Sequence, residues 1–419
     1  MGRIFEVTAS PFKNKTDYVG VEKRFVFETL SQAYIALSIY QGLAINNGGP
    51  TLFHYASRLP GYMDKISGVL DYLCNYTPVT IRVPQDYPII QQAVNAALHG
   101  DTIIVSAGEY QENIVANSKN NVTIRGVIAD PDNPLNSGAN TVINGNKKQV
   151  INLGSSNGIV LDSLVITAGV PFDHNTDYSI SAGGVYCTGE NVVIKNNIIL
   201  NNKGYSGAGI CAIGRNVRIE NNLIKDNNAS SGGGVYVSAG SGGTAVVCKN
   251  KILNNHSWSA GGGLYINSGN VSVYQNIVFG NCSDSSAGMY LFLITGEINN
   301  NIIAQNYTEC FSGGGIYCDN SAILIANNVI YRNSAISWPQ SKCGGVYISG
   351  TNTPIVKNNI ITENYKGGIY YNGTSTCLLT YNDVYSNTND GDNYNGCSAG
   401  EGAISSQPLF VSPDNGDGD

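Results

Sequence analysis

Two polar segments carry the residue types that could perform acid–base chemistry. Asp173, His174 and Asp177 lie in one polar insertion, and His256 lies two residues before Trp258 in another segment. A carboxylate and an imidazole within reach of each other could transfer a proton or bind a cation. Function on a repetitive scaffold usually lies in such segments. These four titratable residues are the catalytic candidates, and an ordinary solvated loop is the alternative interpretation.

A set of tyrosines recurs at intervals of 23 to 30 residues when Cys211 is counted in the set. Each follows an apolar residue that should point inward, so the tyrosines should point outward and lie side by side on a sheet. Aromatic rings at that spacing could contact successive sugars of a polysaccharide, or could pack against each other. The predicted carbohydrate-binding residues are Trp258, Tyr236, Tyr265, Tyr290, Tyr317, Tyr347 and Tyr370.

The segment after each tyrosine alternates between apolar and other residues and then reaches an asparagine. Val192 and Ile194, for example, recur as Val217 and Ile219. A period of two indicates a strand with one buried face. Two asparagine columns five residues apart follow these strands, with Lys251 and His256 as apparent exceptions. Asparagine suits bent backbone and can bond to asparagines above and below, so the columns predict the corners of a stacked coil.

The steps Gly-Gly-x-Val-Tyr and Asn-Asn-x-Ile-x-x-Asn resemble those of the right-handed parallel β-helix repeat proteins, within the pectate-lyase-like superfamily. The resemblance covers roughly residues 80–410 and implies an all-β solenoid of about 11 to 13 coils. It implies a secreted or cell-surface protein that binds a polysaccharide or glycan, or serves in adhesion. The alternative is a polysaccharide lyase or glycoside hydrolase that acts on an acidic polysaccharide. Motifs of the β-helix hydrolases and epimerases are absent from the sequence.

The chain divides into three parts by pattern. Residues 1–78 indicate a small, mainly helical segment of unknown role, residues 79–410 the solenoid, and residues 411–419 a tail that begins a truncated extension. A helix from Pro88 to Leu98, with Asp86 as its N-cap, should cover the first coil. Gly108 to Glu112 resembles the Gly-x-Tyr-x-Glu segment of pectin methylesterases, where it is structural.

The amino-acid composition limits the classes of binding partner that the chain could have. The net charge is −7 and the sequence has no block of basic residues, which argues against nucleic acid as a partner. The sequence also lacks a run of eighteen apolar residues, so it predicts no membrane span. No cofactor is indicated, although the acidic tail could bind Ca²⁺. An extracellular or cell-surface location is expected from the resemblance, although Met1 to Gly20 shows no signal-peptide pattern.

Two further sets of residues complete the expectations. The alternating charges of Lys195, Glu220 and Lys249, with Arg218 and Glu297 beside them, suggest either a salt-bridge ladder or the basic residue of a lyase. Four cysteines should fill inward positions, and three others could form a bridge at the coil corners. The inward set is Cys187, Cys248, Cys318 and Cys377, and the corner set is Cys282, Cys310 and Cys343.

Overall fold

The computed structural model describes residues 77–171, 182–310, 313–335, 342–387 and 392–410. The predicted helical segment at the N-terminus, apart from its last two residues, lies outside this part of the chain, and so does the acidic tail. Three catalytic candidates, Asp173, His174 and Asp177, also lie outside it. Among the described residues, no helix is long and apolar enough to cross a membrane.

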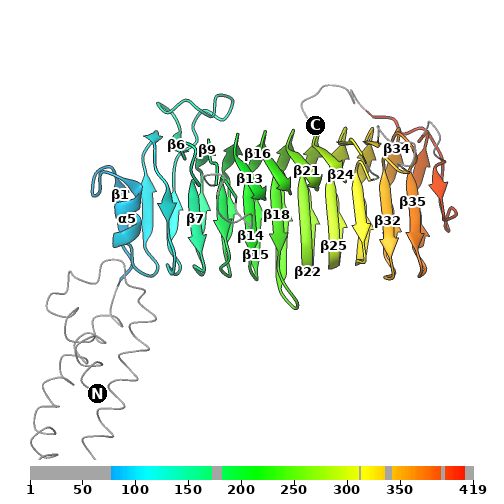
Figure 1. The fold of residues 1–419 in the computed structure, drawn as a ribbon, viewed down its shortest axis with the longest axis horizontal. Coiled ribbons are helices and arrows are strands. Elements are labelled where there is room, and N and C mark those ends of the chain that lie inside the picture. Colours follow the sequence, from blue (N-terminus) through cyan, green and yellow to red (C-terminus); the bar gives the residue numbers. More distant parts are fainter. Residues whose placement is uncertain (1–76, 172–181, 311–312, 336–341, 388–391, 411–419) are drawn as a thin grey trace, which may run out of the picture.

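The described residues form a parallel β-solenoid of about eleven coils, as the repeat predicted. Corresponding strands of successive coils lie side by side along one long axis (Figure 1). They make three sheets of 21, 11 and 6 strands, and the 11-stranded sheet takes one strand from each coil. Two columns of strands make up the largest sheet, because the long strands β22 (Leu264–Tyr274) and β25 (Met289–Asn299) each belong to both columns.

The remaining strands of the 21-stranded sheet are β1 (Thr80–Val83), β2 (Thr102–Val105), β4 (Ile114–Val115), β5 (Thr123–Arg125), β7 (Ile151–Gly154), β8 (Val160–Asp162), β10 (Val185–Cys187), β11 (Val193–Lys195), β14 (Ile210–Ile213), β15 (Val217–Glu220), β18 (Val235–Ser238), β19 (Thr244–Cys248), β28 (Ile316–Asp319), β29 (Ala322–Ala326), β32 (Val346–Gly350), β33 (Ile355–Lys357), β35 (Ile369–Gly373), β36 (Leu378–Thr380) and β38 (Tyr394–Asn395). The 11-stranded sheet consists of β3 (Gly108–Tyr110), β6 (Thr141–Asn144), β9 (Val165–Thr167), β12 (Ile198–Leu200), β16 (Leu223–Lys225), β20 (Lys251–Leu253), β23 (Ile277–Phe279), β26 (Ile302–Ala304), β30 (Val329–Tyr331), β34 (Ile360–Thr362) and β37 (Asp383–Tyr385). The 6-stranded sheet consists of β13 (Lys203–Ser206), β17 (Asn228–Ser231), β21 (His256–Ala260), β24 (Cys282–Ser285), β27 (Tyr307–Thr308) and β31 (Ser334–Ala335).

Alternation of buried and half-buried residues explains these short strands. In β10, Val185 and Cys187 are buried and Tyr186 between them is half-buried. The same arrangement recurs along the stack, so one continuous apolar core runs through the coils. Because the side-chain period of a strand is two, the core fixes which residues face outward.

Two asparagine ladders hold the corners of the coils. In each ladder the side-chain Nδ2 of one asparagine donates to the Oδ1 of its counterpart in the next coil, at 2.9–3.1 Å. The predicted bonding between asparagines of successive coils is therefore confirmed, for example between Asn301 and Asn328. The first ladder comprises Asn197, Asn222, Asn250, Asn276, Asn301, Asn328, Asn359 and Asn382; the second comprises Asn202, Asn227, Asn255, Asn281, Asn306, Asn333, Asn364 and Asn387.

The two expected gaps in the ladders do not exist. Asn250 and Asn255, rather than Lys251 and His256, occupy these positions. The preceding strand is likewise shifted by one residue from the prediction, because Ala245 and Val247 pair with the inward residues of β15. A turn that includes Gly240 and Gly242, both with positive φ, precedes this strand. Residues 245–248 are all apolar, so their pattern alone fits either register.

A short helix, α5 (Ile90–Ala96), covers the first coil at the N-terminal end of the solenoid (Figure 1). It is shorter than predicted, and Asp86 is not its N-cap, because the Asp86 carboxylate accepts a hydrogen bond from the Arg82 amide instead. Glu112 accepts hydrogen bonds from the amides of the first two helical residues at 2.8 and 2.9 Å. Glu112 thus has the structural role that its segment suggested.

Lys119 holds the other end of the helix. Its buried Nζ donates to the carbonyls of Asn95 and Ala97, at 3.0 and 2.8 Å. Burial lowers the pKa of Lys119 to about 8, although the nearby Asp101 opposes the change. An anion at the N-terminus and an amine at the C-terminus both complement the helix dipole, which explains how a seven-residue helix persists here.

Candidate functional site

The outward tyrosines form one row along the largest sheet. Registers on β18, β22, β25, β28, β32 and β35 place them directly beside each other, and Cys211 fills the slot between Tyr186 and Tyr236 as predicted. We call the six residues Tyr236, Tyr265, Tyr290, Tyr317, Tyr347 and Tyr370 the tyrosine row.

Rings of the tyrosine row stack on one another. Neighbouring ring centroids are 4.6–5.3 Å apart, with interplanar angles of 18–41°. Each inner ring therefore has a neighbouring ring on both faces, and its edge and hydroxyl group are the parts left for a partner. Burial raises the pKa of Tyr290, and the Asp319 carboxylate raises it further, so this hydroxyl stays protonated as a hydrogen-bond donor at neutral pH.

A second row runs parallel to the tyrosine row, two residues further along each strand. It contains Asn267, Phe292, Asp319, Ser349 and Asn372, which lie in register with one another. The Asn267 Nδ2 donates to the hydroxyl of Tyr236 at 3.2 Å, and the Ser349 hydroxyl donates to Asp319 at 3.0 Å. The surface thus combines aromatic edges with amides, hydroxyls and one carboxylate.

His256 and Trp258 lie on a strand rather than in the loop that the sequence suggested. They belong to β21, which pairs with β17 and β24 in the 6-stranded sheet. The His256 ring meets the Trp258 ring edge-on at a centroid distance of 4.4 Å, and 62% of Trp258 is exposed. Carbohydrate binding by Trp258 stays a prediction.

The sequence did not reveal the residues that surround His256. One ring nitrogen of His256, the Cys282 thiol and a Glu309 carboxylate oxygen all lie within 4.8 Å of one another. We call these three residues the His–Cys–Glu cluster. The Cys282 Sγ is 3.5 Å from Glu309 Oε1, and the Asp284 carboxylate contributes to the field at the thiol.

Protonation in the cluster is set by its surroundings. Burial raises the pKa of Cys282 to about 11, a hydrogen bond with Tyr307 works against the rise, and Glu309 adds to it. The hydrogen bond with Cys282 also raises the pKa of Tyr307 to about 12. Without a cation the thiol is protonated at neutral pH and is a poor nucleophile. The signal in the sequence is positional: His256, Cys282 and Tyr307 each directly follow an asparagine of the second ladder.

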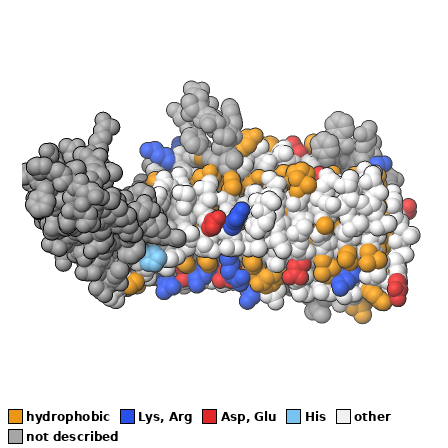
Figure 2. Space-filling view, turned by 90° about the horizontal axis from the view of Figure 1, so that it is seen from below, with side chains coloured by type: hydrophobic (Ala, Val, Ile, Leu, Met, Phe, Trp, Pro, Cys, Tyr) orange, Lys and Arg blue, Asp and Glu red, His pale blue; other side chains and the backbone are white. Residues whose placement is uncertain are grey.

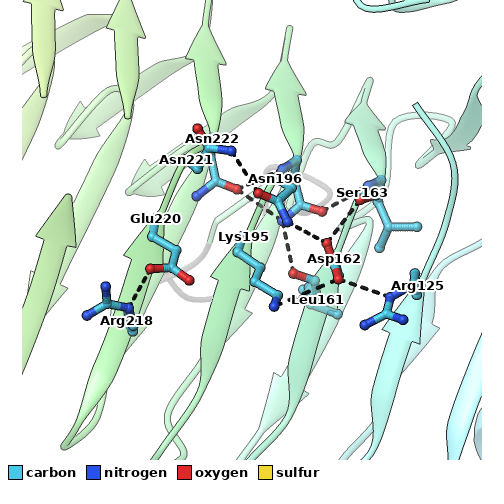
Figure 3. A network of polar contacts seen from close by, with 12 residues as sticks. Arg125, Leu161, Asp162, Ser163, Lys195, Asn196, Arg218, Glu220, Asn221 and Asn222 are labelled. Carbon is cyan, nitrogen blue, oxygen red and sulfur yellow. Dashed lines mark hydrogen bonds and ion pairs between the residues drawn. The ribbon is translucent and has the colours of Figure 1, made fainter. Parts of the chain in front are cut away.

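The charged residues of the sheet form a network rather than the predicted ladder of alternating sign (Figure 3). Arg125 binds Asp162 at 3.0 Å, and the Lys195 Nζ is 4.0 Å from the same carboxylate. Glu220 pairs with Arg218 on its own strand instead of with Lys195 or Lys249. The predicted ladder is therefore wrong.

The displacement of Lys249 has a backbone cause. Lys249 has a positive φ of 58° at the coil corner, which removes it from the row of Lys195 and Glu220. Its place in that row is occupied by Cys248, in register with Glu220.

Asp162 is the buried centre of this network. Burial would raise the pKa of Asp162, but hydrogen bonds from Asn196, Ser163 and Arg125 lower it, and Lys195 adds to the lowering. The carboxylate is therefore ionised and bonded on all sides, so it holds three coils together and has little freedom to act as a base.

Among the described residues, no disulfide joins the corner cysteines Cys282, Cys310 and Cys343. Cys187 and Cys318 lie in the core as predicted. Cys248 is buried in the outward row instead, with its Sγ 3.5 Å from the Arg218 guanidinium, and Cys377 is half-buried against the core.

Residues 257–400 match the family model described as a right handed beta helix region. A comparison with curated proteins found none that matches the chain. The coils that precede the matched segment continue the same sheets, and the asparagine ladders begin before it, at Asn197 and Asn202. Residues 257–400 are therefore similar to the right-handed β-helix family, and the described coils together form a right-handed parallel β-helix.

Proposed function

We propose that this protein binds a polysaccharide or glycan along the tyrosine row, as a secreted or cell-surface protein that serves in carbohydrate binding or adhesion. One observation carries the proposal: six half-buried tyrosines lie in register beside a row of amides, hydroxyls and a carboxylate. Sugars present many hydroxyls beside short apolar patches, and this surface offers hydrogen-bonding groups beside the edges of aromatic rings.

Ring stacking determines how a sugar would meet the row. Because neighbouring rings cover each other's faces, a sugar would contact ring edges and bond to the tyrosine hydroxyls and to Asn267 or Asp319. The coil repeat of about 4.8 Å is close to the length of one sugar unit, so a chain along the axis would meet the same groups repeatedly. Affinity would then accumulate over several coils.

The row itself favours a neutral glycan, because Asp319 is the one carboxylate among the five described residues of the second row. On the face that Figure 2 shows, side chains of both signs are scattered among uncharged ones, and no wide area of a single sign appears. The enzymatic alternative would need a base beside open space, whereas the Arg125–Asp162–Lys195 network satisfies its own charges. Among the described residues, the tyrosine row therefore supports binding better than this charged network supports catalysis.

Affinity gels that contain neutral and acidic polysaccharides would test the proposal. The triple variant Tyr265→Phe, Tyr290→Phe, Tyr317→Phe keeps the stacked rings and removes their hydroxyls, so we expect it to lose most of the retardation that the parent shows. Tyr205→Phe and Tyr381→Phe change exposed tyrosines outside the row and serve as controls. Equal retardation of the parent and the triple variant on every retarding glycan would contradict the proposal.

A further inference from the structure

Three adjacent coils bring an imidazole, a thiol and a carboxylate together on the 6-stranded sheet. His256 and Cys282 are partners in register on β21 and β24, and Glu309 directly follows β27. The three ligand atoms lie within 4.8 Å of one another, with Cys282 Sγ and Glu309 Oε1 already 3.5 Å apart. Ligands around a tetrahedral zinc ion are separated by about 3.3–3.8 Å, which follows from the usual zinc–ligand distances.

We propose that His256, Cys282 and Glu309 bind one zinc ion. Nitrogen, sulfur and one carboxylate oxygen form a donor set typical of zinc and unsuited to calcium, which prefers oxygen ligands alone. Three protein ligands leave a fourth position for water or for a donor atom of a bound molecule. On binding, the thiol loses its proton to solvent and the sulfur binds the metal as a thiolate.

An unsatisfied polar atom supports this assignment. Nδ1 of His256 is buried and has no hydrogen-bond partner among the described residues. A buried polar atom without a partner destabilises the fold unless something binds it. We assign coordination to Nδ1, which would satisfy this atom, and the Cys282 thiolate and the Glu309 carboxylate, with Asp284 nearby, would balance the charge of a dication.

The backbone that carries the ligands is held in place before any metal binds. The amides of His256 and Cys282 donate to carbonyls of ladder asparagines in the preceding coils, both at 2.9 Å. The Glu309 amide donates to the Ser283 carbonyl at 2.9 Å. Parallel strands about 4.8 Å apart set the ligand spacing, so metal binding needs only side-chain rotations.

Zinc titration of the full chain, stripped first with a chelator, tests the site. We expect the parent to bind about one zinc ion per chain. His256→Asn, Cys282→Ser or Glu309→Gln should each lower the zinc affinity at least tenfold, by analogy with the roughly 10- to 100-fold effects of outer-shell substitutions. Matched controls are His99→Asn and Cys397→Ser, which change the same residue types at other described positions. Circular dichroism confirms that each variant is folded. Equal zinc affinity in the parent and in Cys282→Ser would overturn the proposal.

Cobalt provides a second measurement that reports on the ligands themselves. Co²⁺ in the site should give a thiolate charge-transfer band that disappears in Cys282→Ser and persists in Cys397→Ser. The chain has two tryptophans, so Trp338→Phe leaves Trp258 as the sole indole. Because the Trp258 ring lies 4.4 Å from the His256 ring, bound Co²⁺ should quench its fluorescence. Saturating Co²⁺ without quenching in this background would place the metal elsewhere and contradict the assignment.

Discussion

Two columns of side chains run along the solenoid one residue apart, and they differ in kind. The second asparagine ladder repeats one residue type in eight successive coils, from Asn202 to Asn387. The residue after each ladder asparagine changes from coil to coil: among them are Lys203, Asn228, His256, Cys282, Tyr307 and Ser334.

The uniform column has a structural role, whereas the variable column carries the residues that could bind or react. A uniform column satisfies the same backbone groups in each coil, so it serves the fold. A variable column has no common structural task, and its irregular members can form a specific site such as the His–Cys–Glu cluster. In a repeat protein the departures from the repeat are the better guide to function.

The largest expected effect follows from breaking the uniform columns. The Asn328 side chain bonds to the Ile298 and Ala326 carbonyls and to its ladder neighbours in both directions. Asn328→Ala leaves several buried groups unsatisfied, and we expect it to lower the free energy of unfolding by about 1–3 kcal/mol. Urea denaturation measures the change. Asn133→Ala, at an exposed loop position, should change it by less than about 0.5 kcal/mol; equal losses would remove the distinction between ladder and surface.

Asp162 tests whether an irregular polar network can also serve the fold. Asp162→Asn removes the charge that Arg125 and Lys195 share, so we expect a loss of about 2 kcal/mol at neutral pH, as for hydrogen bonds to charged groups. The folded state lowers the pKa of this carboxyl. The stabilisation is therefore complete above the unfolded pKa of about 4 and is lost as pH falls through the folded value.

Thermal melting of the parent and Asp162→Asn at several pH values measures this dependence. The difference in melting temperature should be largest near neutral pH and shrink in acid. A difference independent of pH would show that packing, rather than charge, explains the effect of the substitution.

The end of the solenoid offers a contrast with its repeated middle. Glu112→Gln replaces a carboxylate that accepts two amide hydrogen bonds from the start of α5. We expect a loss of about 1 kcal/mol, comparable to the loss of a helix N-cap. Hydrogen exchange of the α5 amides should increase, whereas exchange in β25 should remain slow. Unchanged exchange in α5 would mean that the carboxylate does not hold the helix.

The smallest effect on stability is expected in the variable column. His256→Asn introduces the residue that occupies the same position one coil earlier, Asn228. In metal-free protein we expect a change of less than about 1 kcal/mol, because a neighbouring coil already accommodates this side chain. Urea denaturation in the presence of a chelator measures it. A loss as large as that of Asn328→Ala would show that the two columns are not different in kind.

The sequence was sufficient to predict the solenoid, the inward residues of most strands and the tyrosine row, because all of these follow from a short period. It failed in one coil, where residues 245–248 are all apolar. Alternation there does not select Ala245 and Val247 as the inward pair over the prediction that included Cys248.

The candidate site could be predicted only in part. His256 stood out by residue type, but its proximity to Cys282 and Glu309 depends on contacts between residues that are 26 and 53 positions away in the chain. These contacts depend on the register of β21, β24 and β27, and the position of each ladder asparagine in its coil sets that register. The pairing of Glu220 with Arg218 was missed for a related reason, since side-chain direction within one strand decides it.

Both asparagine ladders have a direction. At each step the Nδ2 of one coil donates to the Oδ1 of the next coil toward the C-terminus, from Asn197 to Asn382 and from Asn202 to Asn387. Chained hydrogen bonds of this kind polarise one another. A duplicated coil in the same orientation would extend both asparagine ladders and lengthen the solenoid by about 4.8 Å. The ladders thus provide a route by which such a gene can grow by whole coils, with the variable column free to diverge in each new copy.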